Sequence, residues 1–365
     1  MNITNPKYPG ISVETGYDNA NPQDAGMVRV DEDGVYAVRQ FLEDNAPAGY
    51  SFHLNLALNN SGAKPAKVPL RIFWAESNYD YCRDYMYIGY DAGQAWRMLA
   101  TQAAQGVTEM QIVVPPGRHL LCCHPKFDVG DYLALLDRFG GTAPFERIVA
   151  ARSAENRVIA CLRCGNPAGR KLVVTTRAHG YETAGAYCLA GWFAYAAAQP
   201  DRVAEIMNQL NLYFFPMINV DAVAHGNCCL APTGVNFGRE LAVRGGEDAG
   251  ARGLVDFIDG LQPEFYLDMH NNTGPHLSDA FRSDDAGLLA AFAARAPDRS
   301  RDQKVWGAGQ VKWDEGSILT ACRRQFNTLP MLTEFPWYAR APGDMAEHGR
   351  EFFNTLLPLL ADWQV

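Results

Sequence analysis

The chain has 365 residues, of which 48% are hydrophobic and 20% charged, so we expect one large or two ordinary globular domains and exclude a mainly disordered or fibrous protein. Its 32 basic and 41 acidic residues give a net charge of −9, and these charges are dispersed. A broad basic surface for nucleic acid or for an anionic membrane is therefore not expected.

The N-terminal sequence and the cysteines indicate in which cellular compartment the protein is expected. The first 26 residues are polar and lack the apolar core of a signal peptide, and no run of about 18 apolar residues predicts a membrane span. Nine cysteines are spread without the spacing of a disulfide framework. These features favour a cytoplasmic protein with reduced thiols.

Short β-rich segments separated by turn residues dominate the first part of the chain. Residues 51–58, 68–74 and 108–114 are predicted strands, and Asn-Asn-Ser-Gly at 59–62 is a typical turn sequence. Residues 91–105 are predicted to contain a short helix. Strands spaced in this way favour an antiparallel β-sandwich.

Beyond a predicted helix at 130–139, strands and helices alternate. The predicted strands are 157–164, 171–176, 212–218, 264–269 and 329–334, and the predicted helices include 182–198, 254–261, 288–296 and 344–363. Long apolar strands that alternate with helices are typical of an α/β fold with a largely parallel sheet covered by helices. We therefore expect a β-sandwich domain at residues 1–140 and an α/β domain at residues 141–365.

Three candidate metal ligands occur where predicted strands end. His179 and Glu182 follow one strand at a spacing that lets both side chains converge on a cation, and His270 follows another. Two His and one Glu, with a fourth position open, are a ligand set of catalytic zinc sites, so we predict one zinc per chain. The alternative is a structural His and Glu at the start of a helix.

Two further residues near these strand ends are candidates for chemistry. Glu334 ends the apolar strand 329–334, where a carboxylate is costly unless its charge is used. We assign Glu334 as the catalytic residue, the general base that activates a metal-bound water. His276 lies in the loop after His270 and is a candidate substrate contact.

The motifs around these residues resemble those of the M14 zinc carboxypeptidases, most closely the cytosolic carboxypeptidase branch and its bacterial relatives. The resemblance spans residues 150 to 340. The motif Arg177-x-His179-x-x-Glu182 resembles R-x-H-P-G-E, with Gly180-Tyr181 replacing Pro-Gly. Three other segments resemble N-P-D-G-V-x-x-G-N, S-G-x-D-L-N-R and D-x-H, namely Asn219 to Asn227, Thr233 to Arg239 and Asp268 to His270. In the second of these, Gly238 replaces the Asn of the family motif.

The resemblance implies a carboxypeptidase-like fold preceded by a β-sandwich domain, zinc as cofactor and Arg239 as the group that binds a substrate carboxylate. The family pattern also places an Arg shortly after Gly-Asn, where it helps to stabilise the oxyanion. Here Cys228 and Cys229 follow Gly-Asn, and no Arg or Lys occurs from 203 to 238. Arg177 and Arg323 are candidates to supply that charge, and we expect weak activity on standard carboxypeptidase substrates.

Three functions therefore stay open. The first is a metallocarboxypeptidase that acts on the C-terminus of a peptide or protein, with acidic C-terminal residues among the candidates. The second is an amidohydrolase or deacylase of small N-acyl amino acids. The third is a zinc-holding protein that binds peptides with little turnover. A screen of peptides against N-acyl amino acids separates the first two, and the sequence predicts no oligomeric state.

Overall fold

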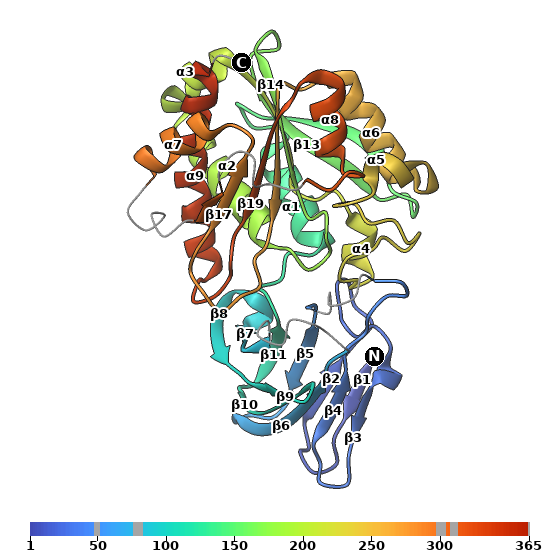
Figure 1. Cartoon of the computed structure of the whole chain (residues 1–365). Helices are drawn as coiled ribbons and strands as arrows, with labels where there is room; N and C mark the ends of the chain where they lie inside the picture. The colour runs from blue at the N-terminus through green and yellow to red at the C-terminus, as the bar shows by residue number, and fades with distance from the viewer. Residues whose placement is uncertain (47–51, 76–82, 297–303, 307–312, 364–365) are drawn as a thin grey trace.

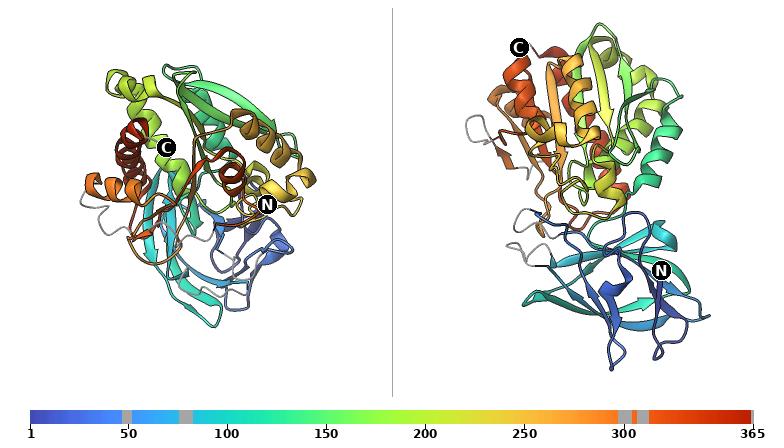
Figure 2. Two further views of the ribbon diagram at one scale, coloured as in Figure 1. Left: turned by 45° about the horizontal axis from the view of Figure 1, so that its top comes forward. Right: turned by 90° about the vertical axis from the view of Figure 1, so that its right-hand side faces the viewer.

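The computed structural model describes residues 1–46, 52–75, 83–296, 304–306 and 313–363. An N-terminal β-sandwich, blue to cyan in Figure 1, lies at one end of a helix-covered sheet. The right-hand view of Figure 2 shows the same end-to-end arrangement. The expected arrangement, an α/β part with a mixed, largely parallel sheet covered by helices and preceded by an antiparallel sandwich, is confirmed.

Two sheets form the sandwich. The first has the order β1-β2-β5-β11-β7-β8 and the second β3-β4-β6-β10-β9, and all their pairs are antiparallel except β4 with β6. The strands are β1 (Asn2–Thr4), β2 (Ile11–Glu14), β3 (Val28–Val30), β4 (Tyr36–Arg39), β5 (Asn55–Asn60), β6 (Ala66–Phe73), β7 (Tyr85–Tyr90), β8 (Ala95–Ala100), β9 (Ala103–Ala104), β10 (Val107–Val114) and β11 (Gly117–Cys122). Alternate side chains of the strands, such as Val68, Leu70 and Ile72, fill the core between the sheets.

The predicted strands of this part correspond to β5, β6 and β10, although residue 51 lies outside the described residues. The helix predicted at 91–105 is wrong. A single 3₁₀ turn, η3 (Asp91–Gly93), is followed by the strands β8 and β9. Pairing of β8 with β7 overrides the helical propensity of this segment. Within the pair, the Trp96 ring packs closely on Gly89, and a Cβ built on Gly89 would lie 2.9 Å from the ring.

The second part is built on an eight-stranded mixed sheet of order β12-β13-β15-β14-β16-β19-β17-β18. Its strands are β12 (Glu146–Arg152), β13 (Val158–Gly165), β14 (Arg170–Thr176), β15 (Leu210–Phe215), β16 (Phe265–His270), β17 (Ala280–Ser283), β18 (Lys304–Trp306) and β19 (Leu329–Glu334). The central neighbours β15, β14, β16 and β19 run parallel. No described strand from before residue 123 joins this sheet.

Helices cover both faces of this sheet (Figure 1). They are α1 (Val129–Phe139), α2 (Ala184–Ala198), α3 (Pro200–Gln209), α4 (Val220–Ala224), α5 (Leu241–Arg244), α6 (Ala249–Leu261), α7 (Ala286–Arg295), α8 (Ile318–Phe326) and α9 (Pro342–Asp362), with 3₁₀ turns η1 (Ala25–Met27) and η4 (Gly245–Glu247). Helices α2, α3, α7 and α9 lie on one side, and α5, α6 and α8 lie on the other. The predicted helices 182–198, 254–261, 288–296 and 344–363 correspond to α2, α6, α7 and α9.

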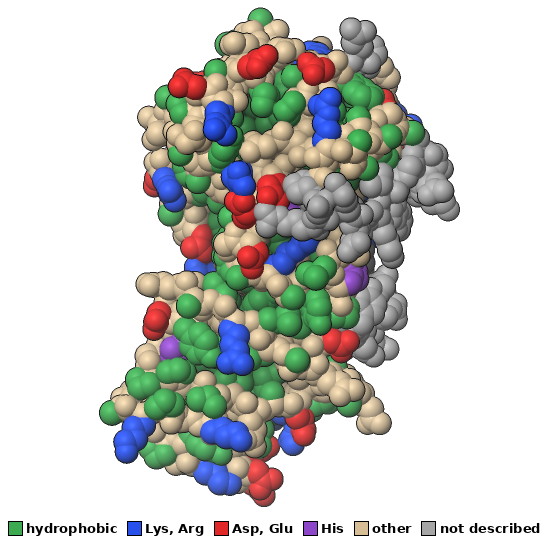
Figure 3. Space-filling model, turned by 90° about the vertical axis from the view of Figure 1, so that its left-hand side faces the viewer, with side chains coloured by type: hydrophobic (Ala, Val, Ile, Leu, Met, Phe, Trp, Pro, Cys, Tyr) green, Lys and Arg blue, Asp and Glu red, His purple; other side chains and the backbone are tan. Residues whose placement is uncertain are grey.

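The surface agrees with the dispersed charge of the sequence. On the face shown in Figure 3, Lys and Arg side chains are interspersed with Asp and Glu. Among the residues that the structure describes, no helix combines the length and the apolar character that crossing a membrane requires.

Candidate active site

The candidate metal ligands lie at the carboxyl ends of neighbouring parallel strands. Strand β14 ends at Thr176, and the connection to α2 carries His179 and Glu182. His270 and Glu334 are the last residues of β16 and β19 and stand opposite each other in the parallel register. Residues in register on adjacent strands point to the same face of a sheet, so the fold gathers all four side chains.

The three candidate ligands form one buried cluster. Glu182 lies between the two histidines, with its Oε1 3.0 Å from His179 Nδ1 and its Oε2 2.9 Å from His270 Nδ1. The two imidazole rings have centroids 5.1 Å apart. One potential ligand atom from each residue lies within 4.8 Å of the others, so the three could hold a single metal ion.

Electrostatics within this cluster keeps both its acid and its base charged. Burial alone would raise the pKa of Glu182, but His270 and His179 hold that pKa well below its usual range. Burial alone would lower the pKa of His270, but the neighbouring Glu182 and Asp268 raise that pKa well above its usual range. A buried carboxylate between two imidazoles is a preformed site for a cation that displaces imidazole protons.

Asp268 supports His270 from behind. Its Oδ2 lies 2.9 Å from His270 Nε2, and its Oδ1 accepts a hydrogen bond of 2.8 Å from the Thr175 hydroxyl. A carboxylate on the second ring nitrogen fixes the orientation and the tautomer of a metal-binding histidine. The sequence placed Asp268 near His270, and the structure gives this contact.

Glu334 stands beside the cluster and is not one of the three grouped ligands. Burial raises its pKa, the nearby Glu182 adds to that shift, and His270 partly opposes it. A carboxyl group with a raised pKa at the rim of a cation site is suited to taking up a proton.

Residues 133–228 match the family model described as zinc carboxypeptidase. The matched segment contains His179 and Glu182 and confirms the resemblance to the zinc carboxypeptidases that the motifs indicated. No curated protein matches the chain.

Two solved structures share this fold. A metallo-carboxypeptidase from Burkholderia cenocepacia is 16% identical, with a TM-score of 0.80, and the match covers 96% of this chain and 99% of that one. A metallo-carboxypeptidase from Pseudomonas aeruginosa, in complex with (2-guanidinoethylmercapto)succinic acid, is 15% identical, with a TM-score of 0.77 and coverage of 95% and 98%. At these identities the likeness concerns the fold.

Within this zinc carboxypeptidase fold, Arg177 lies behind the ligand loop. Its side chain is fully buried, and its guanidinium donates to the carbonyls of Phe127 and Gly180 at 2.8 and 2.6 Å. Burial lowers its pKa to about 10. Because both of these hydrogen bonds hold the backbone in place, we assign Arg177 to the support of the loop and propose no substrate contact for it.

The other candidates, Arg239 and His276 for substrate contact and Arg323 for the oxyanion charge, are more exposed than Arg177. The Arg239 side chain is 41% exposed, and its Nε lies 3.7 Å from Asp314 Oδ2. His276 is exposed in the loop between β16 and β17. Arg323, on α8, pairs with Asp284 at 2.6 Å.

Gly238 contacts the candidate ligand His179, and the sequence motifs did not predict this contact. A Cβ built on Gly238 would lie 2.7 Å from His179 Nε2, so the backbone at this position packs directly on a candidate ligand. The family motif has Asn here, and the sequence indicated only that this Asn is absent. Any side chain at position 238 would displace the imidazole.

Arg282 is a second residue that sequence reasoning missed, because strand β17 was not predicted. In the antiparallel pair of β17 with β19, Ala280 stands opposite Glu334 and Arg282 stands opposite Leu332. Arg282 and Glu334 therefore share one face of the sheet as diagonal neighbours. The Arg282 charge partly opposes the raised pKa of Glu334.

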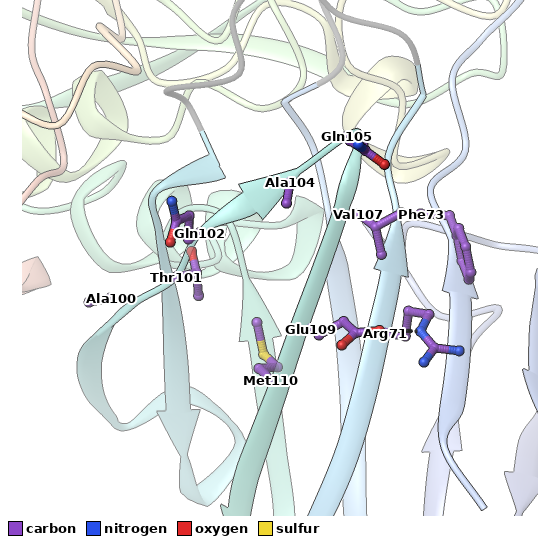
Figure 4. Close-up of a pocket in the computed structure, with 10 residues that line it drawn as sticks. All are labelled: Arg71, Phe73, Ala100, Thr101, Gln102, Ala104, Gln105, Val107, Glu109 and Met110. Atoms are coloured by element: carbon purple, nitrogen blue, oxygen red, sulfur yellow. Dashed lines mark hydrogen bonds and ion pairs between the residues drawn. The ribbon is translucent and has the colours of Figure 1, made fainter. Parts of the chain in front are cut away.

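A pocket of about 840 Å³ lies elsewhere, on the sandwich. Residues of β6, β8, β9 and β10, among them Arg71, Phe73 and Glu109, line it (Figure 4). It contains none of the predicted site residues. The pocket is therefore separate from the cluster at the strand ends, and the chemistry of the side chains favours the cluster as the active site.

Proposed function

We propose that this chain is a zinc-dependent metallocarboxypeptidase that hydrolyses a C-terminal amide bond. The observation that carries the proposal is the convergence of three buried ligand atoms, from His179, Glu182 and His270, with Glu334 beside them at the ends of adjacent strands. Two imidazole nitrogens and one carboxylate suit zinc in a catalytic site with an open coordination position.

When bound there, zinc would acidify a water molecule and polarise the scissile carbonyl. Glu334 would take the proton from that water at its carboxylate and deliver it to the leaving amine. Asp268 would hold the His270 ring in the orientation that presents Nδ1 to the cluster.

Arg239 would bind the carboxylate at the substrate's C-terminus. Its guanidinium is partly exposed, and a planar guanidinium can donate two parallel hydrogen bonds to a carboxylate. The ligand named for the Pseudomonas aeruginosa structure is a succinic acid derivative, so that protein takes up a carboxylate-bearing molecule. His276 would contact the substrate from the loop after β16.

The missing basic residue between 203 and 238 affects the expected rate. Arg177 is buried behind the ligand loop, and Arg323 is engaged with Asp284. Loss of one oxyanion donor typically costs about 10²- to 10³-fold in rate. We therefore expect low activity on standard carboxypeptidase substrates.

The test is a substrate screen with zinc-loaded protein. Peptides with different C-terminal residues, acidic ones included, are compared with N-acyl amino acids, and Glu334→Gln serves as the inactive reference. Release of the C-terminal residue by the wild type alone would support the proposal. Turnover restricted to N-acyl amino acids would favour a deacylase instead.

We also propose a domain division near residue 140 and a reducing compartment. Residues 141–143 are exposed between α1 and β12, where a protease could reach the chain. Eight cysteines among the described residues are free and buried, which suits a protein kept in the cytoplasm. Limited proteolysis should cut the chain at this exposed connection, and a chain that resists cleavage there would argue against the division.

A further inference from the structure

The N-terminal part of the chain is hydrogen-bonded to the end of α4 and to the segment that follows it. Asn19 donates its backbone N–H to the Ala224 carbonyl at 3.2 Å, and the Asn21 side chain donates to the Gly226 carbonyl at 2.9 Å. Gln23 also donates from its side chain to the Ala224 carbonyl, at 3.1 Å. Residues about 200 positions apart in sequence are thus joined by several hydrogen bonds.

The strongest of these links is made by Glu43. Its carboxylate accepts three hydrogen bonds from consecutive backbone N–H groups, those of Cys228, Cys229 and Leu230, at 2.9, 2.5 and 2.8 Å. Glu43 is buried, with 8% exposure. A buried carboxylate is stable only with such partners, and three converging N–H groups form a concave anion-binding site.

The other side of the same segment supports the metal ligands. The Cys228 carbonyl accepts the N–H of Tyr181, which lies in the short loop between His179 and Glu182. The backbone of Gly180 packs on the Asn227 carbonyl so closely that a Cβ would lie 2.2 Å from it. Movement of the segment would therefore move the ligand loop.

An apolar cluster also joins the sandwich to the segment 227–230 and to the ligand loop. Tyr181 packs with Phe52 of the sandwich, with ring centroids 5.3 Å apart, and with Cys228 and Cys229. The Tyr181 ring also lies parallel to the His179 imidazole, with an interplanar angle of 9°. The contacts run without a break from the sandwich, through residues 227–230, to a candidate zinc ligand.

We propose that Glu43 is a positioning residue of the metal centre, through which the N-terminal sandwich sets the geometry of the loop from His179 to Glu182. The proposal rests on the metal site of the proposed function but not on peptidase activity. It gives the sandwich a role in the site without a catalytic residue of its own.

The experiment measures zinc affinity by competition with a chelator, and the visible spectrum after cobalt substitution, for wild type and Glu43→Gln. The Gln side chain turns an NH₂ group toward one or more backbone N–H groups that now bind a carboxylate oxygen. We expect zinc affinity to fall about tenfold, the lower end of the effect of groups that hydrogen-bond directly to metal ligands, and the cobalt spectrum to change.

Two further variants separate positioning from a general loosening of the interface. Gln23→Ala removes a hydrogen bond at the same interface but away from the ligand loop, and it should bind zinc like the wild type. Glu43→Asp keeps the charge on a shorter side chain, and it should recover part of the lost affinity; it also replaces Glu43→Gln if that variant does not fold.

Three outcomes would overturn the proposal. Folded Glu43→Gln (or Glu43→Asp in its place) with wild-type zinc affinity and cobalt spectrum would show that Glu43 only joins the two parts. An equal loss in Gln23→Ala would show that any damage to the interface has this effect. Wild-type protein that binds no zinc would instead refute the metal site and the proposed function together.

Discussion

The Asp268 carboxylate lies 2.9 Å from His270 Nε2, while Glu182 contacts Nδ1 on the other side of the same ring. The imidazole is therefore held between two buried carboxylates, one in the ligand cluster and one behind it. This arrangement makes Asp268 the outer partner of a candidate metal ligand.

Asp268→Asn should weaken zinc binding by about 10- to 100-fold, because the amide no longer fixes the ring as a charged acceptor. Chelator competition measures the effect. Asp256→Asn, at an exposed position on α6, is the matched control and should change nothing. Equal zinc affinity in Asp268→Asn and wild type would show that Asp268 does not support zinc binding by His270.

Gly238→Ala should also weaken zinc binding, for a steric reason. The new Cβ would lie 2.7 Å from His179 Nε2, so the ring has to shift. Gly246→Ala is the control, since among the described residues no atom beyond its chain neighbours and its own helical turn lies within 4 Å of a Cβ built there. If both alanine variants bind zinc equally well, the contact between Gly238 and His179 does not constrain the site.

Glu334→Gln should keep zinc and lose about 10²- to 10⁴-fold in kcat, because the amide cannot accept the proton from water. Metal content and peptide turnover are measured on the same preparation. Substantial turnover by the zinc-loaded variant would exclude Glu334 as the general base. Loss of the metal would indicate that Glu334 is a ligand instead.

Acid should destabilise the protein through buried histidines. Burial lowers the pKa of His53 to about 3, and the nearby Arg177 charge assists. The unfolded chain takes up a proton on His53 below a pH of about 6.5, whereas the folded chain does so only near pH 3. The free energy of unfolding therefore decreases as the pH is lowered from about 6.5 to about 3. In urea titrations between pH 7 and pH 4, His53→Gln should show a smaller fall than wild type. An identical fall would contradict this assignment.

Much of the fold could be predicted because the apolar pattern and the local propensity agree. The segment 329–334 was predicted as a strand with Glu334 at its end, and β19 has these bounds. The helix prediction at 91–105 was wrong because that segment is rich in helix-forming residues, while its structure depends on pairing with β7. Propensity is a weak guide where a neighbouring strand decides.

The sequence predicted only the inner part of the candidate site. His179, Glu182 and His270 each follow an apolar strand, and the spacing between the first two is local in sequence. Glu43 precedes the backbone groups that it binds by 185 to 187 residues, and no local pattern marks it. Gly238 was noticed as a departure from the family motif, but its contact with His179 depends on the folded loop.

The most direct test of the metal centre is elemental analysis of purified wild type and His179→Ala after zinc loading and removal of excess metal. We predict one zinc per chain in the wild type and loss of most of it in the variant, because one of three buried ligands is removed. Circular dichroism shows whether the variant is folded. Full zinc content in folded His179→Ala would contradict the assignment of the site.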